Sequence, residues 1–261
     1  MASPVSVAPA AVRTARLALT VATGALLLLT LGTQAGAQST IEIMTWVPPY
    51  AIEECQAVVE ADFGDCDAED GLTRVGLQFW IPNGDGTVSY QNLGPWGNPT
   101  DADVVWWRDW CTANGIECLL TIYNNDGSTW NWDLARAAFD DNRATFVGAL
   151  IAEMERLDLD GIDLDLEGIG NLNGDRAAFD QFVHDLWLEL DARGKVLTID
   201  SFHYIWNAPN HDWWSDWLGE VKNIHAMGYD DLYEGGTGYH QYSFQQNAGY
   251  SAGYPGTAVL M

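Results

Sequence analysis

The stretch DGIDLDLEG, residues 160–168, places an acidic residue at every second position of an otherwise apolar run. Side chains alternate between the two faces of a β-strand, so Asp163, Asp165 and Glu167 form one row while the apolar residues between them face the other way. An open sheet covered by helices on both faces would bury these acids against apolar side chains, whereas a barrel turns one face of each strand into its lumen. The stretch therefore favours a barrel strand.

Short apolar runs and amphipathic stretches alternate through the rest of the chain, which predicts a parallel sheet with helices outside it. A doubly wound sheet and a (β/α)8 TIM barrel both satisfy this alternation, and the acidic strand favours the barrel. Helical periodicity is clearest over 146–157 and 179–190, the second helix starting at Gly174 or Asp175 and closing at Gly194. Strands are expected at 41–46, 72–81, 117–123, 160–167, 196–202 and 223–229.

The number of strands falls short of a closed barrel. Six strands are followed by PGTAVLM, residues 255–261, which looks like the opening of a seventh. Barrels of this kind take about 250 residues. The expectation is an α/β chain that is truncated at its C-terminus after six to seven strands, and the alternative is a complete six-stranded protein.

The N-terminus has the pattern of a secretory signal peptide. Arg13 and Arg16 precede an apolar run over 17–31, and Ala35-Gly36-Ala37 supplies small residues for cleavage. A transmembrane anchor is the alternative, but the run is short and interrupted by Thr and Gly. We expect a leader over 1–37, a barrel domain over 38–261, secretion, and no membrane association after cleavage.

The charge is strongly acidic, with 37 Asp and Glu against 11 Lys and Arg and a net charge of −26. Loss of the two leader arginines would leave nine basic residues against 37 acidic ones, or −28. Such a surface repels nucleic acid and anionic membranes. Neutral partners are expected.

Four cysteines in an exported chain are more often bonded than free. Of the three possible connectivities, Cys55 with Cys66 and Cys111 with Cys118 is favoured because each pair closes a short loop. No CxxC pair is present to form a zinc site, and no metal is expected.

Confinement of the acid row implies acid–base chemistry. Three carboxylates in a lumen cannot all ionise cheaply, so one is expected to keep a proton near neutral pH. Glu167 comes last, at the C-terminal mouth where barrel enzymes keep their chemistry, and is the candidate general acid. A calcium loop would need Gly at its sixth position, whereas Gly161 directly follows Asp160. NGDG at 83–86 and NNDG at 124–127 are more typical of turns.

Residues 160–167 resemble the DGxDxDxE signature of glycoside hydrolase family 18, the chitinases and endo-β-N-acetylglucosaminidases. Met227-Gly228-Tyr229-Asp230 resembles the MxYD motif of that family, and LTRVGLQFWIPNGDGTVSY, residues 72–90, resembles its second strand and hairpin. The similarity covers most of 41–230. The chain departs from the family at 121–125, where SxGG is usual, and at Leu166, where many members have an aromatic residue.

The resemblance implies a role for each matching residue. Glu167 would protonate the glycosidic oxygen and later act as base, while the 2-acetamido oxygen of the substrate attacks the sugar. Asp165 would orient the acetamido N–H, with Asp163 beneath it in a coupled titration, and Tyr229 would donate to the acetamido oxygen. The anomeric configuration would be retained, without a cofactor. Two further residues would line the sugar subsite: Met227 and Asp230.

Thirteen tryptophans suggest a saccharide groove, because indole faces offer flat apolar surface to sugars. Trp46 and Trp80 are the leading candidates for substrate contact. Helical patterns favour a core position for Trp107, Trp110 and Trp187, and His203 and His225 are expected to be core or loop residues. Other tryptophans expected at strand ends are Trp130, Trp132 and Trp206.

Together these features predict a secreted, monomeric hydrolase that cleaves β-1,4 linkages beside N-acetylglucosamine in chitin or chito-oligosaccharides. Three alternatives stay open: an enzyme that acts on the chitobiose core of N-glycans, a non-catalytic chitin-binding lectin on the same fold, and a structural calcium-binding protein.

Overall fold

The structure, a computed structural model, describes residues 42–61, 67–127, 129–202, 205–227 and 258–260. All of them belong to the unit Ile41–Met261. The predicted leader and its boundary after residue 37 lie outside the described residues and stay predictions. No helix of the described ranges is both long and apolar enough to cross a membrane.

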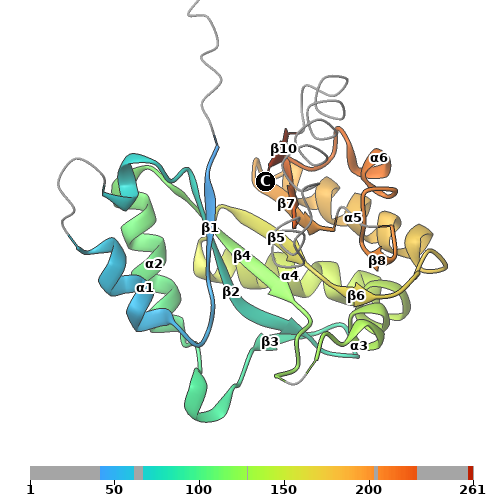
Figure 1. The fold of residues 1–261 in the computed structure, drawn as a ribbon, viewed down its shortest axis with the longest axis horizontal. Helices are drawn as coiled ribbons and strands as arrows, with labels where there is room; N and C mark the ends of the chain where they lie inside the picture. The colour runs from blue at the N-terminus through green and yellow to red at the C-terminus, as the bar shows by residue number, and fades with distance from the viewer. Residues whose placement is uncertain (1–41, 62–66, 128, 203–204, 228–257, 261) are drawn as a thin grey trace, which may run out of the picture. The chain divides into compact units, whose positions relative to one another are not determined.

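Within the described residues, seven parallel strands pair side by side in the order in which they occur along the chain (Figure 1). A doubly wound sheet reverses its strand order, whereas a barrel does not. The predicted fold class is therefore confirmed as a partial (β/α)8 barrel, and the last strand confirms the one predicted within 255–261. The parallel strands are β1 (Met44–Val47), β2 (Arg74–Pro82), β4 (Glu117–Tyr123), β5 (Gly161–Asp165), β7 (Val196–Ser201), β9 (Asn223–Ala226) and β10 (Ala258–Leu260).

Three further short strands in the described ranges lie off this path. β3 (Val88–Tyr90) pairs antiparallel with β2. β6 (Gly168–Ile169) follows Glu167 directly and pairs antiparallel with β8 (Asn207–Ala208), as a separate two-stranded ribbon. The ribbon therefore begins one residue after the predicted general acid.

Helices cover the outer face of the curved sheet (Figure 1). The periodic stretches at 146–157 and 179–190 form α4 and α5, as predicted. Thr100 caps α2 in a reciprocal pair with Asp103, and Gly115 ends it in the left-handed conformation, with φ of 70°. The helices are α1 (Ile52–Val59), α2 (Asp101–Asn114), α3 (Trp132–Arg136), α4 (Arg143–Leu157), α5 (Arg176–Asp191) and α6 (Trp214–Trp217), with 3₁₀ turns η1 (Ala68–Asp70) and η2 (Gly94–Trp96) and a π-helical turn η3 (Ala137–Asp141).

The apolar face of β5 packs on these helices as the alternation predicted. Ile162, Leu164 and Leu166 are fully buried in the core. Phe146 of α4 and Phe182 of α5 stack in the same core with ring centroids 5.0 Å apart. Each fully buried aliphatic side chain contributes about 1.5–3 kcal/mol. This packing fixes the direction of the strand, so the acid row must face the lumen.

Arg74 of β2 connects four parts of the chain at the N-terminal end of the sheet. Its guanidinium is buried, donates to Glu117 of β4 at 2.7 Å and donates to Asn223 of β9 at 2.5 Å. Asn223 in turn donates to Glu42, just before β1, at 2.8 Å. These bonds draw β1, β2, β4 and β9 together below the acid row.

Cys111 of α2 and Cys118 of β4 face each other in the core as free thiols. Contact with Cys111 and burial raise the pKa of Cys118 well above its ordinary value. Cys55 is also a free thiol, and Cys66 lies outside the described residues. The structure therefore does not show the predicted disulfides, and both pairings stay predictions.

Candidate active site

The acid row of β5 points into the lumen and is graded in burial. Asp163 is 0% exposed and Asp165 4% exposed, while Glu167 is half-buried at the end of the strand. Because the carboxyl ends of parallel strands form the mouth of a barrel, the outermost acid is also the most accessible one. This order of burial fits the predicted roles, in which an accessible general acid lies above two buried carboxylates.

Asp163 is held by donors from three strands. Thr121 of β4 and Trp46 of β1 donate to its Oδ2 at 3.0 and 2.9 Å, and Thr198 of β7 donates to its Oδ1 at 2.5 Å. The register explains the two threonines, because each pairs directly with Asp163 on the neighbouring strand. Three hydrogen bonds to one carboxylate stabilise its ionised form. We therefore place a negative charge on Asp163.

Asp165 lies above Asp163 and titrates near neutral pH. Burial and the charge of Asp163 raise the pKa of Asp165 to about 7, although hydrogen bonds with Glu167 and Gln78 act in the opposite direction. Gln78 of β2 donates to Oδ2 at 2.5 Å. The other oxygen, Oδ1, is buried and receives no well-formed hydrogen bond from the described residues. Tyr123 of β4 lies beside this carboxyl, and its pKa is raised by burial and by the charge of Asp165.

Asn124 fixes the backbone of Glu167. The Glu167 N–H donates to Asn124 Oδ1 at 2.8 Å, and Asn124 Nδ2 donates to the Glu167 carbonyl at 2.7 Å. Sequence reasoning noted 121–125 only as a departure from the family pattern. The structure gives this segment two functions, since Thr121 binds Asp163 and Asn124 anchors Glu167.

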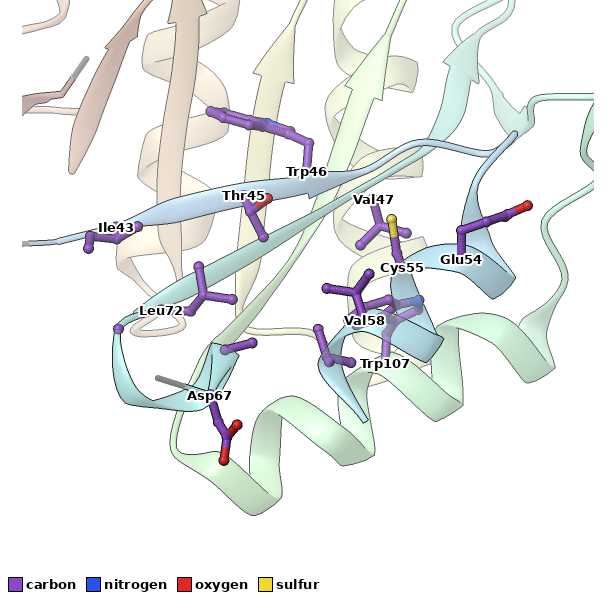
Figure 2. Close-up of a pocket in the computed structure, with 13 residues that line it drawn as sticks. Ile43, Thr45, Trp46, Val47, Glu54, Cys55, Val58, Asp67, Leu72 and Trp107 are labelled. Atoms are coloured by element: carbon purple, nitrogen blue, oxygen red, sulfur yellow. The ribbon is translucent and has the colours of Figure 1, made fainter. Parts of the chain in front are cut away.

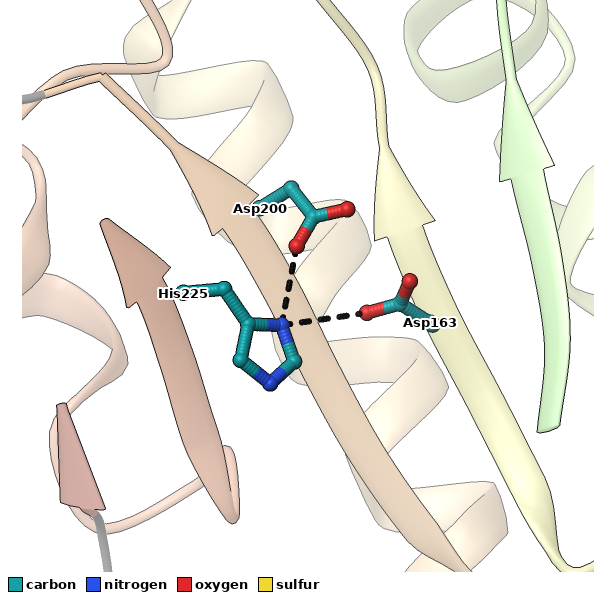
Figure 3. Close-up of side chains that lie close together, drawn as sticks. All are labelled: Asp163, Asp200 and His225. Carbon is teal, nitrogen blue, oxygen red and sulfur yellow. Dashed lines mark hydrogen bonds and ion pairs between the residues drawn. The ribbon is translucent and has the colours of Figure 1, made fainter. Parts of the chain in front are cut away.

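Asp200 of β7 and His225 of β9 complete the floor of the site, and sequence reasoning assigned them no role there. They pair in register, and His225 Nδ1 lies 2.8 Å from Asp200 Oδ1 and 3.7 Å from Asp163 Oδ1 (Figure 3). Burial raises the pKa of Asp200 well above its ordinary value, and the charges of Asp163 and Asp165 add to this effect. The alternation of Thr198 and Asp200 along a buried strand was the signal that could have revealed this polar face.

A metal ion could in principle use this cluster, because two carboxylate oxygens and an imidazole nitrogen lie within 4.8 Å of one another. These atoms already interact with neighbours, however. Thr198 donates to Asp163 Oδ1, and Asp200 Oδ1 lies at hydrogen-bond distance from His225 Nδ1. Asp200 also hydrogen bonds to Asp163. The cluster is thus a hydrogen-bonded floor, and we assign no metal to it.

The predicted sugar-binding residues have different outcomes. Tyr229 and Asp230 lie outside the described residues. Met227 is buried beside the site, where its backbone N–H donates to the Ser201 carbonyl at 2.8 Å. Trp46 points into the lumen, where its indole N–H donates to Asp163. This edge of the indole is therefore not available to bind substrate.

Trp80 does not lie where the sequence placed it. It is 1% exposed and donates to Glu153 of α4 at 3.0 Å, on the helix side of the sheet. The reason is an irregularity in β2, because the pairing with β4 shifts register between Leu77 and Trp80. An extra residue reverses the side-chain alternation. We therefore remove Trp80 from the candidate site.

The other strand-end tryptophans also differ. Trp132 is buried and donates to Asp175 at 2.8 Å, so it belongs to the core. Trp130 is half-buried, with its ring centroid 6.2 Å from that of Tyr123. Trp206 is 53% exposed next to β8. Trp130 and Trp206 stay candidates for sugar contact.

An apolar cavity of about 450 Å³ lies elsewhere, between β1 and α1 (Figure 2). Val47, Cys55, Val58, Leu72 and Trp107 form much of its wall. No member of the acid row lines it. We therefore do not place the chemistry there.

No model of a known protein family matches the chain, and no curated protein matches it. Solved structures share its fold. The first is a chitinase from Chromobacterium violaceum, 18% identical with a TM-score of 0.55, covering 72% of this chain and 56% of that one. The second is the family 18 chitinase ChiB of Flavobacterium johnsoniae, with 18% identity, a TM-score of 0.52 and coverage of 72% and 54%. The third is the Bacillus cereus spore cortex-lytic enzyme SleL, with 17% identity, a TM-score of 0.58 and coverage of 72% and 42%.

This likeness shows a shared fold, that of the glycoside hydrolase family 18 chitinases, at low sequence identity. It agrees with the resemblance predicted from the motifs. The chain spans about half of the length of the solved structures that it matches.

Proposed function

We propose that this protein is a glycoside hydrolase that cleaves β-1,4 linkages beside N-acetylglucosamine, with chitin or chito-oligosaccharides as substrate. The acid row carries the proposal: two buried carboxylates lie below a half-buried Glu167 at the mouth of the lumen. The fold shared with chitinases supports the same reaction class. A net charge of −26 favours a neutral polymer over an anionic one.

In the first step Glu167 donates its proton to the glycosidic oxygen, and the bond between that oxygen and the anomeric carbon breaks. The acetamido oxygen of the sugar bonds to the anomeric carbon and forms a positively charged oxazolinium ring. The leaving chain departs as a neutral alcohol. In the second step the Glu167 carboxylate takes a proton from water, whose oxygen adds to the anomeric carbon and opens the ring with retained configuration.

Asp165 supports this step through charge and orientation. Its buried Oδ1, which lacks a well-formed hydrogen bond from the described residues, is free to accept the acetamido N–H. Its carboxylate would also stabilise the oxazolinium cation, a favourable interaction in a site with little water. Tyr229, outside the described residues, is proposed to donate to the acetamido oxygen.

Export after cleavage of residues 1–37 belongs to the same proposal and rests on the leader pattern alone. We also propose that the exported protein is a monomer. The likeness to a spore cortex-lytic enzyme makes cortex fragments a second substrate to assay.

The direct test is Glu167→Gln, measured by release of a chromophore from a chito-oligosaccharide. Removal of a general acid should lower kcat by about 10²- to 10⁴-fold. Ligand binding should persist, because the amide keeps the shape of the side chain. Glu69→Gln, at an exposed position of η1, is the matched control and should keep full activity. Unchanged turnover in Glu167→Gln would exclude Glu167 as the acid.

A further inference from the structure

Asp200 and His225 belong to neither of the two sequence motifs, yet they form a buried pair directly against Asp163. Asp200 is 3% exposed and His225 4% exposed. The Nδ1 of His225 lies 2.8 Å from one Asp200 oxygen (Figure 3). The carboxyl of Asp200 also hydrogen bonds to Asp163. Two carboxyl groups can share a hydrogen bond only if one of them carries the proton.

The contacts decide which carboxyl holds that proton. Asp163 accepts hydrogen bonds from three side chains and so has no need of one. Asp200 has a single side-chain donor in the described part of the chain, His225, and burial raises the pKa of Asp200 well above its ordinary value. Asp200 is therefore the neutral acid, and Asp163 is the acceptor.

His225 is in its neutral form beside this acid. Burial lowers the pKa of His225 to about 4, against the opposing charge of Asp163. Its Nε2 is buried and has no hydrogen-bond partner within the described part of the chain. A buried nitrogen without a partner is more readily tolerated as an acceptor than as a donor. The proton thus lies on Nδ1, from which it is donated to Asp200 Oδ1.

We propose that Asp200, held by His225, is a positioning residue that donates a hydrogen bond to Asp163 and leaves Asp165 able to carry the negative charge opposite the sugar. Without this donor, the full charge of Asp163 would act on Asp165 and hold it in its neutral form. The role in catalysis rests on the proposed function, whereas the proton placement rests on the hydrogen bonds and the burial of the three side chains.

Among the described residues, the other charged groups around this floor come from four strands or their flanks. From β5 and its end they are Asp163, Asp165 and Glu167. Tyr123 of β4 faces Asp165, while Arg74 of β2 and Glu42 before β1 act on His225 from below. Arg74 and Glu42 have opposite charges and act on His225 in opposite directions.

Two substitutions of Asp200 separate the effect of its hydrogen bond to Asp163 from the effect of its size. Asp200→Asn keeps an N–H for Asp163 and an oxygen for His225, whereas Asp200→Val keeps the approximate shape and loses both. In a plot of kcat against pH, the fall of kcat on the acid side should report protonation of Asp165. In Asp200→Val this fall should occur at a pH about one unit higher than in the wild type, the size expected for one nearby charge. In Asp200→Asn the fall should occur at the same pH as in the wild type. Equal profiles for wild type and Asp200→Val, or equal displacement in both variants, would overturn the proposal.

A second measurement needs no substrate. ¹⁵N NMR of histidine-labelled protein, with the His225 signal identified by its loss in His225→Gln, should show a neutral ring at pH 6 that carries its proton on Nδ1. An imidazolium signal at pH 6 would place the proton on His225 and refute the assignment to Asp200. Absence of hydrolase activity would refute the proposed function, and the NMR result would still decide the proton placement. The Asp200→Asn variant and this spectrum also decide the question if Asp200→Val does not fold.

Discussion

Trp46 was predicted to contact substrate, but in the structure its side chain holds a carboxylate of the acid row. Its indole N–H is one of three donors to Asp163. A Trp46→Phe variant keeps an aromatic ring and loses that donor. Because hydrogen bonds to charged groups contribute about 1.5–3 kcal/mol, the unfolding free energy should fall by roughly the lower figure, with a loss of kcat. Denaturant titration and initial rates measure the two effects.

Trp107→Phe is the control for this substitution. Trp107 is also buried, but its indole nitrogen has no hydrogen-bond partner among the described residues. The variant should keep the kcat of the wild type. A Trp46→Phe enzyme with unchanged kcat would show that the two threonines suffice to hold Asp163.

Asn124 tests whether Glu167 depends on its backbone anchor. Asn124→Ala removes both hydrogen bonds to the Glu167 peptide without changing the Glu167 side chain itself. Misplacement of a catalytic group by about 1 Å can lower turnover by roughly 100-fold, so kcat should fall by about 10- to 100-fold. Asn125→Ala, which removes only a turn contact to Gly127, should have a much smaller effect. Similar rates in both variants would contradict the anchoring role.

At the scale of the strand, Gly76 of β2 makes room for the support of Asp163. A Cβ at this position would lie 2.5 Å from Thr121 Oγ1 and 3.0 Å from Trp46 Cδ1. Both side chains donate to Asp163, so Gly76→Ala should displace two of its three donors. Overpacking of this kind costs about 1–3 kcal/mol, and the melting temperature and kcat should fall together.

The helix α4 offers the opposite case. A Cβ added at Gly148 would meet no atom within 4 Å. Alanine in a helix is favoured over glycine by about 0.5–1 kcal/mol, so Gly148→Ala should raise the melting temperature without loss of kcat. If Gly76→Ala were equally harmless, the lumen around Thr121 would be looser than the structure shows.

At the scale of the whole molecule, Arg74 joins strands that are distant in sequence. Arg74→Met should lower the unfolding free energy by about 1.5–3 kcal/mol, the contribution of charged hydrogen bonds. Arg136→Met is the comparison. Arg136 Nε lies 3.9 Å from Oδ1 of its partner Asp133, whose side chain is 91% exposed. Exposed pairs contribute about 0–1 kcal/mol. Equal losses in urea titrations of the two variants would show that the buried network adds no stability.

The sequence predicted the barrel class because alternation along β5 is a local property that survives in the fold. It also placed Asp163, Asp165 and Glu167 on one face. Asp200 and His225 escaped prediction because their role depends on the register between β7 and β9, which no single strand encodes. Trp80 was misplaced for a related reason, since one extra residue in β2 reverses the alternation. Positions that depend on pairing between strands therefore needed the structure.

Titration of the buried acids predicts how stability depends on pH. The pKa values of Asp165 and Asp180 are each raised to about 7, mainly by burial, and burial also raises the pKa of Asp200 well above its ordinary value. Between about pH 4 and 7 these groups bind more protons in the folded state than in the unfolded chain. Each of them therefore makes the folded protein less stable as the pH rises through this range. The lowered pKa of His225 has the opposite effect between about pH 4 and 6.5, but it is one group against three.

The unfolding free energy should therefore increase as the pH falls from about 7.5 to 5, a window set by these pKa values. Asp180→Asn should flatten this dependence. Asp180 hydrogen bonds to Asp216 and Trp217 between α5 and α6, outside the acid row, so the variant should keep its activity. Urea titrations at several pH values measure the slope for both proteins. A stability that rises with pH across this window would mean that the buried carboxyls are ionised in the folded protein. An unchanged slope in Asp180→Asn would mean that Asp180 does not contribute to the dependence.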